Sequence, residues 1–373
     1  MTTHPPAGTT PAASPADTDE TRRLRHAMVD TMTTEGIRPD VLDAFRAEPR
    51  HVYVPRFVRR VETAPHTWET RVFTCDHPDW TREVYTDQLL VTATMFGDDG
   101  PPLSSSTVPS LMAAMLDALA VEPGMHVVEI GAGTGYNAGL LARLAGDDNV
   151  TTVDIEPDVA TTARRALTAA GHPNVTVVHT DGSHPPAAPR SLDRLIATCG
   201  VDRVPPGWLA AVRPGGRLVL PLGTGIACLT VDEHGHAEGP FLATPAYFMG
   251  LRTTAGTNNI PYPGDPTGSR EPCAMPLDAW HDDDLRFPLG LALPASDLGQ
   301  RDLPDALTLW TGDGSVATIH ANGTSRQSGP RRLADELANV RRDFESAGRP
   351  GREHHRLRID SQGRHTTSFT PSA

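Results

Sequence analysis

Short apolar runs alternate with longer amphipathic segments between residues 124 and 231. The runs are rich in Val, Ile and Leu, as buried strands of a parallel sheet are, and the segments between them repeat apolar residues at helical spacing. We expect strands at 126–130, 150–154, 175–179, 192–198 and 217–221. We expect helices between them at 136–145, 158–170 and 206–212. The pattern therefore predicts an α/β domain built on a Rossmann-like, doubly wound sheet.

The segments before this domain have a different character. Residues 1–20 are rich in Thr, Pro and Ala and show no apolar periodicity, which predicts a disordered tail. Residues 21–100 open with Leu24 and Met28 on one helical face, so we expect a helical N-terminal cap segment. The sheet domain then occupies residues 101–240.

A C-terminal extension, residues 241–373, carries no recognisable chemical motif. Gly312-Asp313-Gly314 predicts the turn of a hairpin at 306–320. Apolar spacing predicts a helix at 330–347, and 356–359 is expected to be a last strand. We therefore expect an α+β unit here, with a role in recognising a peptide substrate.

Composition excludes several classes of function. The 373 residues carry a formal charge of −13, which argues against nucleic acid as a partner because phosphate binding needs a basic surface. The chain contains no lysine, which excludes a P-loop lysine and Schiff-base catalysis. The four cysteines are far apart, and no signal peptide or run of eighteen apolar residues occurs. These features predict a cytoplasmic protein that does not bind a membrane.

A glycine-rich loop follows the first expected strand. Residues 127–137 read VVEIGAGTGYN, with Glu129 on the strand and Gly131, Gly133 and Gly135 in the loop. Glycines let a backbone approach a ligand where a Cβ atom would clash. Dinucleotide-binding loops space their glycines G-x-G-x-x-G, whereas this G-x-G-x-G spacing is similar to that of S-adenosyl-L-methionine (AdoMet) methyltransferases. We expect AdoMet as the cofactor, with Glu129 at its methionine end.

Two further acids end the next two strands. We expect Asp154, with its neighbour Ile155, to bind the ribose hydroxyls, and Glu156 is the alternative. We expect Asp181 and Gly182 at the adenine edge. Each acid also has a simpler explanation, a helix N-cap for Asp154 and an ordinary Asp-Gly turn for Asp181.

Other polar clusters do not form a convincing site. His281 to Asp284, His354-His355 and His234-x-His236 lack complementary metal ligands at sensible spacing, so we expect no metal site. Ser191 stands in no nucleophile elbow and has no paired histidine, so a hydrolase is not supported.

About half of the chain resembles the protein-L-isoaspartate O-methyltransferases. The resemblance rests on landmarks that occur in the family's order and spacing. They are Arg-His-Val-Tyr-Val-Pro (50–55), Val-Tyr-Thr-Asp (84–87), Thr-Val-Pro-Ser-Leu-Met-Ala (107–113), the glycine loop, Thr-Asp-Gly (180–182) and Arg-Pro-Gly-Gly-Arg-Leu-Val-Leu-Pro-Leu-Gly (213–223). The resemblance implies a class I AdoMet methyltransferase fold.

The resemblance also implies roles for the hydroxyl run that precedes the glycine loop. Thr107 occupies the position of the family's active-site serine, and Thr107 and Ser106 are the implied catalytic residues. Ser104 and Ser105 are implied cofactor contacts. The competing interpretation is a polar loop and a helix N-cap, since a proline follows two residues later.

Two departures narrow the resemblance further. A threonine replaces the serine, and the chain continues for about 130 residues where the repair enzymes end. With Asp193 to Cys199, these departures are similar to methyltransferases of ribosomally made peptides, the ATP-grasp-cyclised graspetides and the related lanthipeptide and FxLD systems. That subgroup implies methylation of an aspartate in a macrocyclic precursor peptide, followed by succinimide (aspartimide) and isoaspartate formation. The ATP-grasp cyclase becomes a possible partner.

Two alternatives stay open. One is a repair enzyme that methylates isoaspartate in damaged proteins. The other belongs to a different class, a non-catalytic AdoMet-binding scaffold for the peptide. Methylation of a carboxylate needs no general base, because a carboxyl group with a pKa of about 4 is already ionised at neutral pH.

Overall fold

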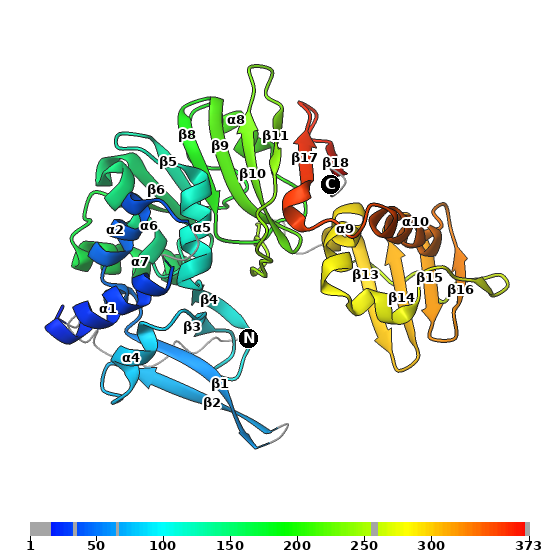
Figure 1. Ribbon diagram of the computed structural model, residues 1–373, viewed down its shortest axis with the longest axis horizontal. Coiled ribbons are helices and arrows are strands. Elements are labelled where there is room, and N and C mark those ends of the chain that lie inside the picture. The colour runs from blue at the N-terminus through cyan, green and yellow to red at the C-terminus, as the bar shows by residue number, and fades with distance from the viewer. Residues whose placement is uncertain (1–15, 33–35, 65–66, 255–259, 370–373) are drawn as a thin grey trace.

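The computed structural model describes residues 16–32, 36–64, 67–254 and 260–369 of the chain (Figure 1). Most of the predicted disordered tail therefore lies outside the described residues. The first helix begins before residue 20, the predicted end of that tail, because Thr18 and Thr21 bond each other's backbone and side-chain groups at the helix start. The N-terminal helices are α1 (Asp19–Met32), α2 (Pro39–Ala47) and α3 (Arg50–Tyr53).

A four-stranded antiparallel sheet follows, which the sequence did not predict. Its strands are β1 (Arg56–Ala64), β2 (Thr67–Thr74), β3 (Leu90–Thr94) and β4 (Pro102–Ser106), in the order β2-β1-β3-β4, with α4 (Trp80–Val84) between β2 and β3. The expected helical cap is therefore helical only in its first part. Phe57 and Phe73 stack across the β1–β2 hairpin at 4.8 Å, which gives that hairpin a small core of its own.

The main sheet contains the predicted strands at the predicted places. Its parallel strands are β5 (Val127–Ile130), β6 (Val150–Asp154), β7 (Thr176–His179), β8 (Leu192–Ala197) and β9 (Val212–Leu222). Helices α5 (Pro109–Leu119), α6 (Tyr136–Ala145), α7 (Pro157–Ala170) and α8 (Pro206–Ala211) connect them. Successive residues of a strand face opposite sides of a sheet, so Val127 packs with α5 and α6 while Val128 packs on the side of α8.

Four antiparallel strands extend the main sheet beyond β9. They are β10 (Gly225–Val231), β11 (Ala237–Pro240), β17 (His355–Ile359) and β18 (His365–Phe369). The predicted strand at 356–359 is thus confirmed, but it joins the main sheet beside β11 and not the C-terminal unit. The extension that we expected as one unit after residue 240 is therefore divided between two sheets.

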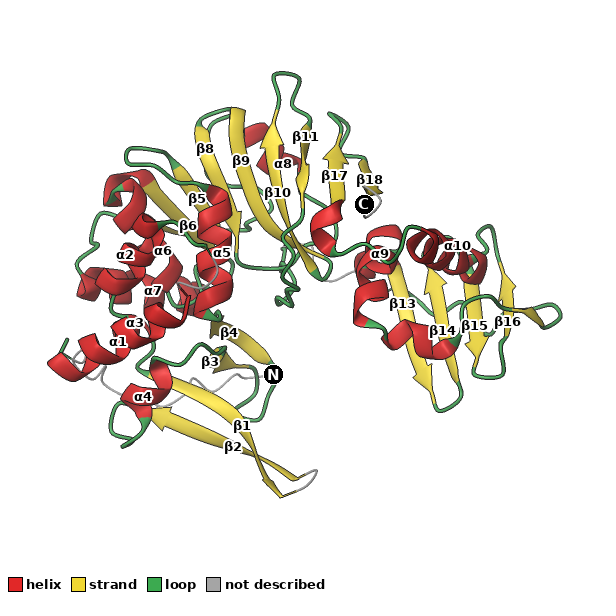
Figure 2. Ribbon diagram, in the orientation of Figure 1, coloured by secondary structure: helices red, strands yellow, loops and turns green. Residues whose placement is uncertain are grey.

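The C-terminal domain, residues 271–346, is an α+β unit beside the end of the main sheet (Figure 2). Its strands are β12 (Glu271–Pro272), β13 (Leu298–Leu303), β14 (Ala306–Thr311), β15 (Val316–His320) and β16 (Thr324–Ser328). Its helices are α9 (Asp283–Ala292) and α10 (Leu333–Ser346), which confirms the predicted hairpin and helix. Phe287 of α9 joins the domain to the main sheet through an edge contact of 4.9 Å with Phe241.

Candidate active site

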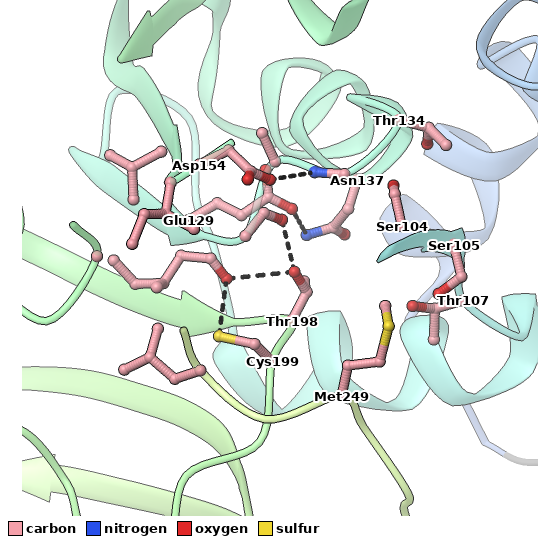
Figure 3. Close-up of a pocket in the computed structure, with 18 of the residues that line it drawn as sticks. Ser104, Ser105, Thr107, Glu129, Thr134, Asn137, Asp154, Thr198, Cys199 and Met249 are labelled. Carbon is pink, nitrogen blue, oxygen red and sulfur yellow. Dashed lines mark hydrogen bonds between the residues drawn. The ribbon is translucent and has the colours of Figure 1, made fainter. Parts of the chain in front are cut away.

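One cavity of about 890 Å³ opens at the carboxyl ends of β5, β6 and β8 (Figure 3). The strand order reverses at β5, which lies between β6 and β8, and parallel α/β sheets bind their ligands at such a point. The cavity is lined by ten of the twelve predicted site residues, namely Ser104, Ser105, Ser106, Thr107, Glu129, Gly131, Gly133, Asp154, Ile155 and Gly182. Gly135 and Asp181 do not line it.

The glycine loop lies on the floor of the cavity in a conformation that favours glycine. Gly131, Gly133 and Gly135 have φ angles of +98°, +52° and +87°. A Cβ atom on Gly131 would lie 2.7 Å from the hydroxyl of Thr198, so that residue cannot be enlarged without displacing the cavity wall. Gly135 differs from the prediction. A Cβ atom there would lie 3.1 Å from the carbonyl oxygen of Ala163, so this glycine allows α6 to begin close against α7.

Glu129 is fully buried at the base of the cavity and is held by two donors. Its Oε1 accepts a hydrogen bond of 2.8 Å from Asn137 Nδ2, and its Oε2 accepts one of 2.6 Å from Thr152. Burial raises the pKa of Glu129 to about 7, against the two hydrogen bonds that lower it. The other amide atom, Asn137 Oδ1, is buried and has no partner among the described residues. The base of the cavity therefore has an acceptor that a bound donor would satisfy.

The acid at the end of β6 connects the strand to the glycine loop. Asp154 accepts hydrogen bonds from the backbone N–H of Gly133, at 3.1 Å, and from that of Glu156, at 3.0 Å. The N-cap interpretation is not supported, because Glu156 is the N-cap residue of α7 and neither of these two donors to Asp154 lies within that helix. The same carboxylate also lines the cavity, where it is able to accept further hydrogen bonds. Glu156, the alternative, instead forms an ion pair of 2.9 Å with Arg252.

The hydroxyl run lies on β4 and forms the opposite wall (Figure 3). Ser104 accepts a hydrogen bond of 3.3 Å from Thr92, and Ser106 accepts one of 3.1 Å from Arg50. The hydroxyl of Thr107 has no partner in the described part of the chain. Ser105, which also lines the cavity, likewise has no side-chain partner among the described residues, so Ser105 and Thr107 are the two members of the run whose hydroxyls are unpartnered.

A segment that the sequence did not single out covers the cavity. We call residues 246–254 the strap. Gly200 holds it by two backbone hydrogen bonds of 2.8 Å: the N–H of Gly200 donates to Met249 O, and the carbonyl of Gly200 accepts from Leu251 N. Arg252 donates to Leu103 O at 3.3 Å. The strap contributes Met249, Gly250, Leu251 and Arg252 to the lining.

Asp181 fastens the far end of the strap instead of lining the cavity. Its Oδ2 accepts hydrogen bonds from Thr254 N at 2.8 Å and Thr254 Oγ1 at 3.0 Å, and its Oδ1 accepts two from Ser183. Burial raises the pKa of Asp181, but these hydrogen bonds outweigh it and lower the pKa to about 2. The predicted contact with the adenine edge is therefore left to Gly182, which does line the cavity.

Cys199, which also lines the cavity, is not a nucleophile in this structure. Burial raises the pKa of its thiol to about 12, so the thiol is protonated at neutral pH. Within the described ranges, no three His, Cys, Asp or Glu side chains converge as metal ligands, and no helix is long and apolar enough to cross a membrane.

Comparison with known sequences identifies the protein family of this chain. The profile of the family described as Protein-L-isoaspartate(D-aspartate) O-methyltransferase (PCMT) matches residues 23–236, more than half of the chain. The chain belongs to this family. It is therefore a member of a family of AdoMet-dependent protein carboxyl O-methyltransferases with a class I methyltransferase fold, as the sequence predicted.

Individual relatives agree with the family match. The protein-L-isoaspartate O-methyltransferase of Methanococcoides burtonii is 33% identical over 207 residues, 55% of this chain and 86% of that protein. The enzyme of the same name from Thermotoga maritima is 36% identical over 140 residues, which span 37% of this chain and 43% of that protein. The matched stretch thus covers less than half of the second relative.

A solved structure extends the likeness in fold to the C-terminal domain. A protein-L-isoaspartate O-methyltransferase of 22% identity superposes with a TM-score of 0.58, covering 93% of this chain and 99% of that chain. The expectation that such enzymes end soon after the sheet is therefore wrong for at least one of them. The extension cannot by itself distinguish a peptide-maturation enzyme from other family members.

The residues of the cavity fit AdoMet, the family's cofactor. Glu129 and the unpartnered Asn137 Oδ1 offer acceptors for the ammonium group, and Asp154 offers one for the ribose hydroxyls. A Cβ atom on Gly133 would lie in ordinary contact with Ser105 O, at 3.4 Å, so the φ angle of +52° is what favours glycine at this position. Asn137 lies within the glycine motif, but we did not predict it as a site residue, because its position is equally consistent with the first turn of a helix.

Proposed function

We propose that this protein transfers a methyl group from AdoMet to the carboxylate of an L-isoaspartyl residue in a protein or peptide. The observation that carries the proposal is the unpartnered hydroxyl of Thr107, on the wall opposite Glu129 and Asp154. The names of the relatives support isoaspartate as the substrate. This function was the alternative hypothesis from the sequence. The comparisons support it better than they support methylation of a precursor peptide.

The residues present suffice for this reaction. AdoMet, when bound, supplies a methyl group carried on a positively charged sulfur. The substrate carboxylate is ionised at neutral pH, so no residue of the cavity has to remove a proton from it. Thr107 donates a hydrogen bond to one carboxylate oxygen and leaves the other free as the nucleophile. Alignment of this kind lowers an activation barrier by up to about 7–11 kcal/mol.

The product ester has a further reaction that needs no protein group. The backbone nitrogen of the following residue attacks the ester carbonyl, methanol leaves, and a succinimide ring closes. Hydrolysis of the ring returns either aspartate or isoaspartate. Repeated methylation of the isoaspartyl product would convert the population towards normal aspartate.

A pair of synthetic peptides tests the proposal. One contains L-isoaspartate and the other contains L-aspartate at the same place in the same sequence. We expect the protein with AdoMet to add the mass of one CH2 group to the isoaspartyl peptide alone, and then to release methanol. Methylation of neither peptide, with AdoMet binding intact, would refute isoaspartate as the substrate.

A second candidate is the finer prediction from the sequence, an aspartate in a ring-containing precursor peptide. Nine arginines stand against six acids between residues 331 and 364, but seven of these arginines form ion pairs with carboxylates of the chain, so the excess of arginine adds little support for an acidic peptide. The same mass measurement separates the two functions when an ATP-grasp-cyclised precursor is added as a third substrate. Methylation of that precursor alone would favour dedicated peptide maturation. AdoMet binding without methylation of any of the three would favour the non-catalytic scaffold.

A further inference from the structure

Arg50 is a buried cation directly behind the wall that carries the hydroxyl run. Its side chain is fully buried, and its guanidinium donates only to neutral oxygens. These acceptors are Ser106 Oγ (3.1 Å), Val84 O (3.0 Å), Thr86 O (2.9 Å), Gln88 O (3.1 Å), Ser106 O (3.4 Å) and Thr107 O (3.2 Å). No carboxylate in the described part of the chain forms an ion pair with it.

An unpaired buried charge is costly, and hydrogen bonds alone compensate it only in part. Burial lowers the pKa of Arg50, but only to about 10, so the positive charge persists at neutral pH. Asp87, which acts on Arg50 electrostatically, is exposed, and its carboxylate accepts a hydrogen bond of 2.8 Å from Ser110 N. The charge of Arg50 is therefore not neutralised locally.

The location of the charge matters for the cavity. Three of the six hydrogen bonds go to Ser106 and Thr107, and both residues line the cavity. A single layer of backbone thus separates the guanidinium from the cavity. Water does not reach this layer from the Arg50 side, because Arg50 is fully buried. A positive charge acts more strongly across such a layer than across solvent. The two acids of the lining, Glu129 and Asp154, belong to the opposite wall.

We infer that Arg50 is a positioning residue that makes the Thr107 wall selective for an anionic substrate group. It holds the carbonyls of Ser106 and Thr107 in place, and its charge attracts the substrate carboxylate to the Thr107 hydroxyl. The inference rests on the proposed function, because it assigns the carboxylate of the substrate to this wall. It adds a positive charge behind the hydroxyl run that is not paired with a carboxylate, whereas Arg252, a cation of the lining, forms an ion pair with Glu156.

The chain offers a matched control in Arg194. That arginine is also buried, 7% exposed, and it donates to the carbonyls of Ala120 and Asp193 without an ion pair. It does not line the cavity or contact the hydroxyl run. Loss of Arg194 therefore reproduces the loss of a buried guanidinium without the proposed electrostatic effect.

The test compares two peptides in the presence of S-adenosylhomocysteine, by calorimetry. One peptide carries the isoaspartyl carboxylate and the other carries a carboxamide in its place. We expect the wild type and Arg194→Met to prefer the carboxylate peptide by at least about tenfold. We expect Arg50→Met to lose that preference and Arg50→Lys, which keeps the charge, to retain most of it.

Two results would overturn the inference. In the first, Arg50→Met keeps the wild-type preference, or Arg50→Lys loses it while it still binds S-adenosylhomocysteine. In the second, the wild type shows no preference for the carboxylate, which would also overturn the proposed function. If Arg50→Met does not fold, Arg50→Gln takes its place; it also removes the charge, so we expect it to lose the preference, and a wild-type preference in the folded Arg50→Gln protein would overturn the inference.

Discussion

Asn137 donates to Glu129 at 2.8 Å and thereby turns its own Oδ1 away from that carboxylate, into a buried place with no partner in the described chain. Figure 3 shows the pair at the base of the cavity. This pair thus offers two acceptors at the base of the cavity, where we expect the ammonium group of AdoMet.

Replacement of Asn137 by Leu removes one of the two acceptors. We expect the affinity for S-adenosylhomocysteine to fall by about 10- to 100-fold, since a hydrogen bond to a charged group contributes about 1.5–3 kcal/mol. The affinity for 5′-methylthioadenosine, which lacks the amino-acid end, should be nearly unchanged. Calorimetry with both ligands measures the difference. An equal loss of affinity for the two ligands would mean that Asn137 does not bind the amino-acid end of the cofactor.

Cofactor binding should depend on the ionisation of Glu129. Its pKa of about 7, raised by burial, means that the carboxyl group gains its charge as the pH rises through neutrality. We expect AdoMet to bind more tightly at pH 8 than at pH 6, because the ionised form attracts the ammonium group. Glu129→Gln should remove this dependence. A pH-independent affinity of the wild type would contradict the assignment.

The pair Glu48 and His172 should make stability depend on pH. His172 Nε2 lies 3.0 Å from Glu48 Oε2, and its Nδ1 lies 2.8 Å from Asp147 Oδ1. The hydrogen bond with Glu48, followed by that with Asp147, raises the pKa of His172 against burial. A raised pKa gives stability that is complete below the unfolded value of about 6.5 and is lost as the pH rises through the folded value.

His172→Asn therefore tests a specific difference. We expect it to reduce the free energy of unfolding by about 1–3 kcal/mol at pH 6 and by less at pH 9. Urea unfolding at both pH values measures this, with His179→Asn, an exposed histidine, as the control. A loss for His172→Asn that is the same at both pH values would show that protonation does not contribute.

The strap should loosen when Asp181 is removed. Asp181→Ala abolishes both hydrogen bonds to Thr254 and should leave the glycine loop in place. We expect faster hydrogen exchange at the amide of Leu251, with little change in β5. Hydrogen bonds lower the pKa of Asp181 to about 2, so its contribution to holding the strap should be complete above the ordinary pKa of about 3.9 and be lost as the pH falls through the lower value. Unchanged exchange at Leu251 would mean that the contacts of Gly200 and Arg252 hold the strap without Asp181.

The sequence predicted those parts of the fold and the site that depend on residues close together in the chain. The glycine loop, its strand and the acid Asp154 form one local βαβ unit, so their pattern predicted the fold and five residues of the cavity, whereas Ser104 to Thr107 came from the family resemblance. Gly135 and Asp181 belong to the same unit, but their surroundings come from α7 and the strap. Their roles depend on tertiary contacts that no local pattern encodes.

The features that the sequence missed are contacts between distant segments. Arg50 reaches Ser106 over 56 residues, and Arg252 reaches Leu103 over 149. The strap has an irregular backbone, so it shows no periodicity to read. The strand β17 was predicted at 356–359, but nothing in its sequence specifies the sheet that it joins, and β18 was not predicted.

The central claim is that Thr107 presents its hydroxyl to an isoaspartyl carboxylate, and kcat/KM for an isoaspartyl peptide in Thr107 variants tests it most directly. We predict that Thr107→Val, which keeps the shape but removes the donor, lowers kcat/KM by about 10- to 100-fold. Thr107→Ser should stay close to the wild type, and both should bind S-adenosylhomocysteine normally. A Thr107→Val protein as active as the wild type would contradict the account.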